Sequence, residues 1–308
     1  MKKTKIVFMG TPIFGREILR CLTENGYDVV AAVCQPDKAV GRKQVITYCP
    51  VKQYAIEKNI DVIQPIKIKN EYQTILDYHP DLIITCAYGQ IIPTALLDNV
   101  HCINVHASLL PKLRGGAPIQ HSIIDGYDKT GITIMEMAKK MDSGDIISQC
   151  EVAIDIRDTY KSLHDKLIAA AVELLLKTLP NIIERNYVAV KQNEEEVTFG
   201  YNISKEEEHL NLSKNYRQVY DQIRGLSDNP GCYGLIDNKK IKLYQVEMTD
   251  DTCQAVNGTI VFKGKEFGII VDNRLLLIKQ LQMEGKSVMS SKDFRNGTGR
   301  NWEGKVMC

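Results

Sequence analysis

Short apolar runs alternate with amphipathic segments along the first half of the chain. The apolar runs are rich in Val, Ile and Ala, which predicts buried strands, and the segments between them have the spacing of helices. Strands separated by helices form parallel sheets covered on both faces, so we predict an α/β fold with a doubly wound, mostly parallel sheet. Its strands are expected at 5–9, 28–34, 81–86, 102–105, 132–137 and 146–154, and its helices include 12–24, 51–58 and 71–78.

The pattern changes after a long helical segment at 159–183. Residues 186–204 are polar, with an acidic run at 194–196, and are predicted to form a linker. Short strand-like runs separated by Gly and Asn-Gly turns follow, which predicts a small C-terminal β-barrel of the OB-like kind. We therefore expect a first domain over 1–203, linker included, and a smaller domain over 204–308.

Composition narrows the class of protein. The 308 residues are 44% apolar and 25% charged, which is ordinary for a soluble globular protein. Lys and Arg number 39 against 38 for Asp and Glu, so any contact with nucleic acid has to come from local basic patches. No apolar stretch approaches the roughly 20 residues of a membrane helix, and the run at 6–9 is too short for a signal peptide. We expect a cytoplasmic protein with no membrane segment.

The cysteines give no sign of a metal centre. All nine are scattered, and no two form a CxxC or share zinc-ligand spacing with histidines. Free thiols in a reducing compartment fit this pattern best. We predict no metal site.

Candidate chemistry begins at the end of the strand predicted at 102–105. Asn104 and His106 are two residues apart, so their side chains are expected on the same face of the strand. Open α/β sheets bind ligands at the carboxyl ends of their strands. An amide donor beside an imidazole suits acyl transfer to an amine, because both can stabilise the oxyanion and the imidazole can also move a proton. The alternative is that Asn104 caps a turn and His106 packs in a loop.

A carboxylate from a later turn is the third candidate. Asp142 lies in a Met-Asp-Ser-Gly-Asp turn between two predicted strands. Placed near His106, it would favour the imidazolium and accept a proton from the attacking ammonium. The turn itself offers two other interpretations, since Asp before Ser-Gly is ordinary turn chemistry and Asp145 is a rival carboxylate.

These residues together resemble the signature of the folate-dependent formyltransferases, a family with a Rossmann-like catalytic domain. The resemblance rests on Asn104, His106, the Ser-Leu-Leu-Pro run at 108–111, Arg114-Gly115 and the turn of Asp142. It implies that Asn104, His106 and Asp142 are the catalytic residues. It also implies that two stretches bind the folate, namely Ser108, Leu109, Leu110 and Pro111, and Ala87, Tyr88, Gly89, Gln90 and Ile91.

Other segments are similar to the members of this family that act on initiator methionyl-tRNA. The opening at 8–14 has their pattern and lacks the spacing of a dinucleotide fingerprint, which disfavours a nicotinamide enzyme. The segment 35–43 is similar to their tRNA-contacting loop, and the resemblance assigns tRNA contact to Lys38, Arg42 and Lys43. Residues 44–48 depart from the family pattern, which leaves the details of that contact open. The C-terminal domain resembles their tRNA-binding barrel.

The resemblance thus implies a complete reaction. The formyl group of 10-formyltetrahydrofolate, a co-substrate and not a permanently bound cofactor, moves to the α-amine of an initiator methionyl-tRNA. We expect a monomer. Two alternatives remain at this point: a sugar-nucleotide N-formyltransferase with the same donor, and a non-catalytic folate- or RNA-binding protein.

Overall fold

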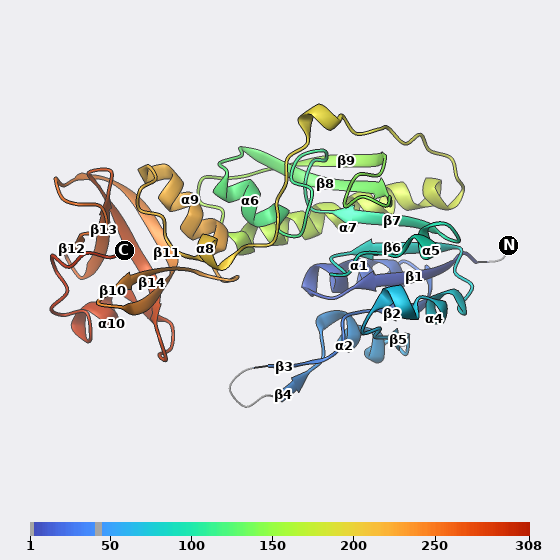
Figure 1. Cartoon of the computed structure of the whole chain (residues 1–308), viewed down its shortest axis with the longest axis horizontal. Coiled ribbons are helices and arrows are strands. Elements are labelled where there is room, and N and C mark those ends of the chain that lie inside the picture. Colours follow the sequence, from blue (N-terminus) through green and yellow to red (C-terminus); the bar gives the residue numbers. More distant parts are fainter. Residues whose placement is uncertain (1–2, 41–44) are drawn as a thin grey trace. The chain divides into compact units, whose positions relative to one another are not determined.

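The structure, a computed structural model, describes residues 3–40 and 45–308 (Figure 1). It divides into two compact units. The first comprises the chain up to Pro118 together with Lys129–Ala153 and His164–Tyr201. The second comprises Asn202–Cys308 and two earlier segments, Ile119–Asp128 and Ile154–Leu163. That the two domains meet between residues 203 and 204 stays a prediction.

A 7-stranded sheet organises the first unit, and its strands follow the order β5-β2-β1-β6-β7-β8-β9 (Figure 1). The pairings from β5 to β7 are parallel, whereas β7-β8 and β8-β9 are antiparallel. The prediction of a mostly parallel α/β sheet is therefore confirmed. In chain order the strands are β1 Lys5–Gly10, β2 Asp28–Val33, β5 Asp61–Ile63, β6 Leu82–Cys86, β7 His101–His106, β8 Lys129–Glu136 and β9 Ile146–Ala153.

The central strands are apolar without interruption because both faces of the sheet are covered. Every residue of β6 is buried, and β1 is buried from Ile6 onward. The edge strand β9 alternates between partly buried and exposed residues. Helix α1 (Ile13–Glu24) buries the apolar side of its amphipathic pattern, including Ile18 and Leu22. A small separate hairpin, β3 (Lys38–Val40) with β4 (Val45–Thr47), lies between β2 and the next helix.

Most predicted helices are confirmed. Those expected at 12–24, 51–58 and 159–183 correspond to α1, α2 and α7. The helix expected at 71–78 is confirmed only in part, because two four-residue helices lie at 68–71 and 73–76 and Tyr72 separates them. Ile75 N bonds to Tyr72 O, three residues back, at this junction. Between α1 and Asn202 the described residues also form α2 Pro50–Glu57, α3 Ile68–Glu71, α4 Gln73–Leu76, α5 Thr94–Leu97, α6 Pro118–Ile124, α7 Tyr160–Ile183 and the 3₁₀ turn η1 Glu194–Glu196.

The second unit is built around a 6-stranded antiparallel sheet, which confirms the short strands expected there. Closure of this sheet into an OB-like barrel stays a prediction. Its strands are ordered β10-β11-β14-β13-β12, and β15 pairs with β14. Phe294 anchors its core, with ring centroids 4.9 Å from Phe267 and 5.1 Å from Trp302. The elements are α8 Lys205–Glu208, α9 Tyr216–Leu226, β10 Cys232–Ile236, β11 Lys239–Thr252, β12 Ile260–Lys263, β13 Glu266–Val271, β14 Arg274–Met283, β15 Met289–Ser290 and α10 Ser291–Asn296.

Within residues 3–40 and 45–308, no helix has the length and apolar character needed to span a bilayer. In the same part of the chain, no group of three or more His, Cys, Asp or Glu side chains is arranged to hold a metal ion.

Candidate active site

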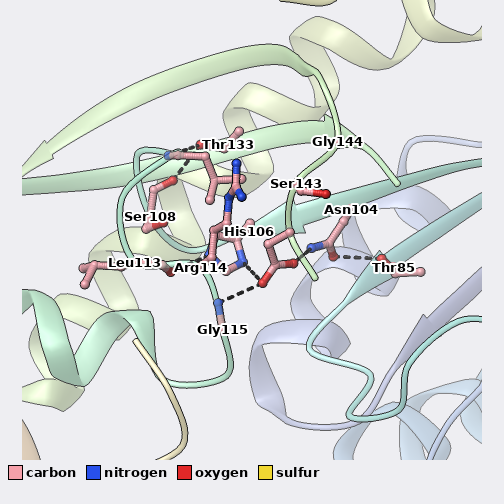
Figure 2. Close-up of polar contacts among 12 residues, drawn as sticks. Thr85, Asn104, His106, Ser108, Leu113, Arg114, Gly115, Thr133, Ser143 and Gly144 are labelled. Carbon is pink, nitrogen blue, oxygen red and sulfur yellow. Dashed lines mark hydrogen bonds and ion pairs between the residues drawn. The ribbon is translucent and has the colours of Figure 1, made fainter. Parts of the chain in front are cut away.

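The three polar side chains singled out from the sequence meet at one edge of the first sheet (Figure 2). Asn104 and His106 lie on β7, where Asn104 pairs with Thr85 of β6 and His106 with Thr133 of β8. Asp142 comes from the turn between β8 and β9, at a positive φ of 50°. The structure therefore brings together residues that are 38 positions apart in the chain.

The amide of Asn104 is oriented by its neighbour on β6. The hydroxyl of Thr85 donates to Asn104 Oδ1 at 2.8 Å. With its oxygen engaged, the amide directs Nδ2 toward Asp142 Oδ1, 3.5 Å away. The long distance leaves this N–H₂ group available as a donor. Thr85 was not predicted as part of the site, and its one sequence signal is a lone polar residue within the apolar run of β6.

Both ring nitrogens of His106 face polar atoms of the protein, and one of them is hydrogen-bonded. Nε2 donates to the carbonyl oxygen of Leu113 at 3.0 Å, since a carbonyl can only accept. Nδ1 lies 3.8 Å from Asp142 Oδ2. Leu113 presents its carbonyl from a left-handed conformation with φ 59°. The imidazole is buried, and an imidazolium would satisfy the carbonyl and the carboxylate at once.

Asp142 is the carboxylate that contacts the other members of the cluster. Its Oδ2 accepts a hydrogen bond from Gly115 N at 2.9 Å. Asp145, the rival in the same turn, instead uses its backbone carbonyl to bond Glu136 N at 2.9 Å. The turn is further fixed from outside, because Gln192 Nε2 donates to the carbonyls of Asp142 at 2.8 Å and Gly144 at 2.7 Å. Gly144 itself is packed so closely that an added Cβ would lie 1.8 Å from Glu136 O.

The segment predicted as a linker forms part of the site. The buried guanidinium of Arg114 donates from Nε and Nη2 to Gln192 Oε1, at 3.0 and 2.8 Å. Its Nη2 also reaches Glu194 Oε1 at 2.8 Å. Backbone bonds continue the contact, from Arg114 N to Thr198 O and from Gly200 N to Arg114 O, each 2.9 Å. Nothing in a polar run of sequence reveals such a partner.

The first stretch assigned to folate is a loop held by its own polar groups. Ser108 Oγ donates to Lys112 O at 2.6 Å, and Thr133 Oγ1 donates to Ser108 O at 2.6 Å. Thr133 Oγ1 in turn accepts from Leu110 N at 3.1 Å. Ser108 and Leu110 are buried, whereas Leu109 and Pro111 are partly exposed. The hydroxyl of Ser108 is thus engaged within the protein, and the remaining contacts this loop offers are apolar side chains and backbone.

The second stretch, 87–91, presents an exposed apolar side chain next to a buried one. Ile91 is 82% exposed, which is unusual for isoleucine, while Tyr88 is buried with no hydrogen-bond partner for its hydroxyl. Ala87 and Gly89 adopt positive φ values of 50° and 92°. Gln90 Oε1 accepts from Ile68 N at 3.0 Å, which fixes the loop to α3.

Only the base of the predicted tRNA loop lies in the described part of the chain. Lys38 begins β3 and pairs with Thr47 of β4. Arg42 and Lys43 lie outside the described residues. Beside the hairpin, Lys52 Nζ is 2.5 Å from Asp37 Oδ2.

The chain is similar in sequence to known proteins over nearly its whole length. The family model described as formyl transferase matches residues 4–179, and that described as formyl transferase, C-terminal domain, matches residues 202–299. Curated proteins named methionyl-tRNA formyltransferase from Bacillus thuringiensis and Bacillus anthracis are each 48% identical over 300 residues, which is 96% of this chain and 96% of theirs.

Solved structures share the fold at lower identity. HypX from Aquifex aeolicus has a TM-score of 0.72 and 14% identity over 98% of this chain, which spans 50% of the HypX chain. An N-formyltransferase from Helicobacter canadensis, solved with folinic acid and dTDP-3-aminofucose, has a TM-score of 0.68 and 19% identity, covering 91% of this chain and 99% of that one. At these identities the likeness concerns the fold alone.

Proposed function

We propose, from the premise that this chain belongs to the formyl transferase family, that it moves the formyl group of 10-formyltetrahydrofolate onto the α-amine of initiator methionyl-tRNA. The observation that carries the chemistry is the cluster of Asn104, His106 and Asp142 at the carboxyl end of β7. The near full-length relatives named methionyl-tRNA formyltransferase support the choice of acceptor.

The first step is removal of a proton from the methionyl ammonium. Asp142 is the base we assign to it, either directly or through a water. Its Oδ2 accepts a hydrogen bond from Gly115 N at 2.9 Å, and its Oδ1 lies 3.5 Å from Asn104 Nδ2. A carboxylate with one oxygen anchored keeps its lone pairs in a fixed direction, which supports proton transfer from a docked ammonium.

The free amine then attacks the formyl carbon, and the carbonyl oxygen becomes an oxyanion. Asn104 Nδ2 and protonated His106 are the donors we assign to it. Both are fixed before the reaction by Thr85 and by Leu113 O, so little reorganisation accompanies charge development. The carbon–N10 bond breaks as N10 takes a proton from His106. The new formamide nitrogen gives its extra proton back to the imidazole, and Asp142 releases the proton it accepted to solvent. No covalent enzyme intermediate is required.

The binding roles follow the loops. We assign the folate to Leu109, Pro111 and the exposed Ile91, with the backbone of 87–91 and 108–111 around them. Apolar side chains beside backbone donors and acceptors suit a flat heterocycle. Lys38, Arg42 and Lys43 are assigned to the acceptor stem as phosphate or base contacts. We further propose that the protein is cytoplasmic, since translation initiation supplies the acceptor in that compartment. We also propose that it is a monomer.

A formyl-transfer assay with parallel acceptors tests the function. The purified protein is given 10-formyltetrahydrofolate with charged initiator tRNA, charged elongator tRNA or an amino-sugar nucleotide. Formylmethionine on the initiator tRNA alone is the expected result. Transfer to the sugar alone would retain the chemistry and overturn the acceptor, and no transfer to any acceptor would overturn the enzymatic function.

A further inference from the structure

Two cysteine thiols face each other at the base of the β3-β4 hairpin. Buried Cys34 directly follows β2, and partly exposed Cys49 directly precedes α2. The hairpin pairs Lys38 with Thr47, so the segments that enter and leave it run side by side. The thiol of Cys34 is hydrogen-bonded to the sulfur of Cys49. The reaction proposed above uses neither residue.

Polar contacts that do not involve the sulfurs hold this pair in register. Lys52, three residues beyond Cys49, donates to Asp37 Oδ2 at 2.5 Å and to Gln64 Oε1 at 2.7 Å. Gln64 Nε2 donates in turn to the carbonyl of Gln35, the residue after Cys34, at 2.9 Å. Both backbone segments that carry the thiols are therefore tied to the same two side chains.

The surroundings make the two sulfurs unequal. The hydrogen bond from Cys34 is the main cause that lowers the pKa of Cys49 from 9.0 to about 6. Burial opposes the change, and the backbone N–H groups of Lys52 and Val51 in the first turn of α2 favour it. The same hydrogen bond and burial raise the pKa of Cys34. These shifts favour the thiolate at partly exposed Cys49 and the thiol at buried Cys34.

We propose that Cys49 is a peroxide-reactive site and that Cys34 resolves its oxidised form into an intramolecular disulfide. The Cys49 thiolate attacks one oxygen of hydrogen peroxide, the O–O bond breaks, and the hydroxide that leaves takes a proton to become water. Cys34 then attacks the Cys49 sulfenic sulfur, and the second hydroxide leaves with the proton of Cys34 as water. Two thiols and one peroxide thus give one disulfide and two waters, and a thiol reductant reverses the change.

Oxidation of the two cysteines would also affect the proposed folate-binding loop, because Gln35 connects the two. Gln35, next to Cys34, donates from Nε2 to the carbonyl of Tyr88 at 3.1 Å, and its backbone N donates to Thr11 Oγ1 at 3.2 Å. A disulfide draws two sulfurs from hydrogen-bond contact to about 2.05 Å, which displaces the attached backbone. The bridged form should therefore show a KM for the folate raised at least severalfold. This last effect rests on the proposed function, whereas the thiol chemistry does not.

The test uses the full-length reduced protein treated with a small excess of hydrogen peroxide. We expect peptide mapping by mass spectrometry to show a Cys34–Cys49 bridge that dithiothreitol reverses. Cys34→Ser should instead leave a sulfenic acid on Cys49 that dimedone traps, and Cys49→Ser should leave Cys34 unreacted. Cys253→Ser removes another partly exposed thiol, in the second unit, and should behave as the wild type.

Rates in the unmodified protein provide a measurement that does not depend on how the variants fold. At pH 7, alkylation by iodoacetamide should be on the order of tenfold faster at Cys49 than at Cys253 in the same sample, because thiolate character controls the rate. Equal rates at the two residues, or a sulfinic acid on Cys49 without a bridge, would overturn the thiol site. An unchanged folate KM in the fully bridged protein would overturn the link to the loop of Tyr88 and leave the site standing.

Discussion

Each of the proposed catalytic side chains has one atom fixed by the protein and another left for the substrates. Thr85 fixes the oxygen of Asn104, and the carbonyl of Leu113 fixes Nε2 of His106. Gly115 N fixes one oxygen of Asp142. Groups anchored in this way stabilise developing charge without first having to reorient, which is the usual source of the largest catalytic effect.

Replacing His106 by alanine removes both an oxyanion donor and the proposed acid for the leaving nitrogen. We expect kcat to fall by a factor of roughly 10² to 10³, with little change in KM for the tRNA. Steady-state kinetics with varied acceptor measure both constants. Wild-type activity in this variant would remove His106 from the mechanism.

Thr85→Val keeps the volume of the side chain but removes the hydroxyl that orients Asn104. The freed amide can rotate, so we expect kcat to fall on the order of tenfold, which corresponds to the net energy of one hydrogen bond. The KM values for the folate and for the tRNA should stay unchanged. Thr85→Ser retains the donor and should restore most of the rate. If serine and valine reduced kcat equally, the role of the hydroxyl would be refuted.

At the scale of elements, the site depends on a segment with no regular structure. Residues 192–200 bond to the loop of Arg114 and to the turn of Asp142, although they follow the long helix α7 and contain only the short turn η1. The three parts of the chain meet through one amide, that of Gln192. A displacement of this segment would move the carboxylate and Gly115 together.

Gln192→Ala tests this dependence. The change removes the Gln192 oxygen from the buried Arg114 guanidinium, which keeps its contact with Glu194. It also removes the donor to two carbonyls of the turn, so we expect a loss of about 1–3 kcal/mol of stability. The kcat should fall while binding of the tRNA is retained. Glu195→Gln, at an exposed position of the same segment, is the matched control and should leave both quantities unchanged.

A second cluster joins the beginning of β7, the end of β8 and the chain after α7. The hydroxyl of Tyr187 donates to Glu136, and Glu136 also bonds His101 Nε2 at 2.9 Å. Burial is the largest single influence on the pKa of Glu136 and raises it, but the hydrogen bonds from His101 and Tyr187 and the attraction to His101 and Arg185 together outweigh it. The pKa is therefore lowered below its ordinary value of 4.5. A carboxyl whose pKa is depressed by folding stabilises the fold above its unfolded pKa, and this contribution is lost as the pH falls through the folded value.

Tyr187→Phe should therefore destabilise the protein in a pH-dependent way. At pH 7 Glu136 is ionised, and loss of the hydrogen bond should cost about 1–2 kcal/mol. The difference from the wild type should narrow as the pH drops below 4.5, where the carboxyl begins to protonate. Thermal unfolding followed from pH 3 to pH 8 gives the comparison, and a difference that grows on acidification would contradict the assignment.

At the scale of the whole molecule, charge is nearly balanced, with a formal net charge of +1. A protein that binds RNA without an overall basic excess has to concentrate its contacts with phosphate in a few places. We proposed one such place at Lys38, Arg42 and Lys43. A small number of contacts predicts a shallow dependence of binding on salt.

Replacing those three residues by alanine should flatten the salt dependence of tRNA binding. Each lost phosphate contact reduces the slope of log K against log salt by about 0.7 to 0.9, so the total change should be about 2 to 3. Lys69, Lys177 and Lys191 are exposed lysines whose triple replacement serves as the control. Equal slopes for the two triple variants would exclude the loop as a phosphate-binding site.

The sequence predicts the sheet well because continuous apolar runs specify doubly covered strands. It also places Asn104 and His106 on one face, since two-residue spacing on a strand is enough for that inference. It is less accurate at 71–78, where the structure has two short helices, at 68–71 and 73–76, in place of the single helix expected. Thr85 and Gln192 escape prediction for another reason, because their partners are 19 and 50 residues away along the chain and no local pattern encodes such contacts.

The packing of Gly144 has a consequence for how variation in this protein should be interpreted. A Cβ at this position would collide with the backbone of Glu136 and push the turn that carries Asp142 out of place. Gly144 brings no side chain to the reaction, yet saturation mutagenesis should score it as intolerant as Asp142. A map of mutational tolerance alone would thus add a residue without chemistry to the catalytic set, and only the geometry of the turn separates the two.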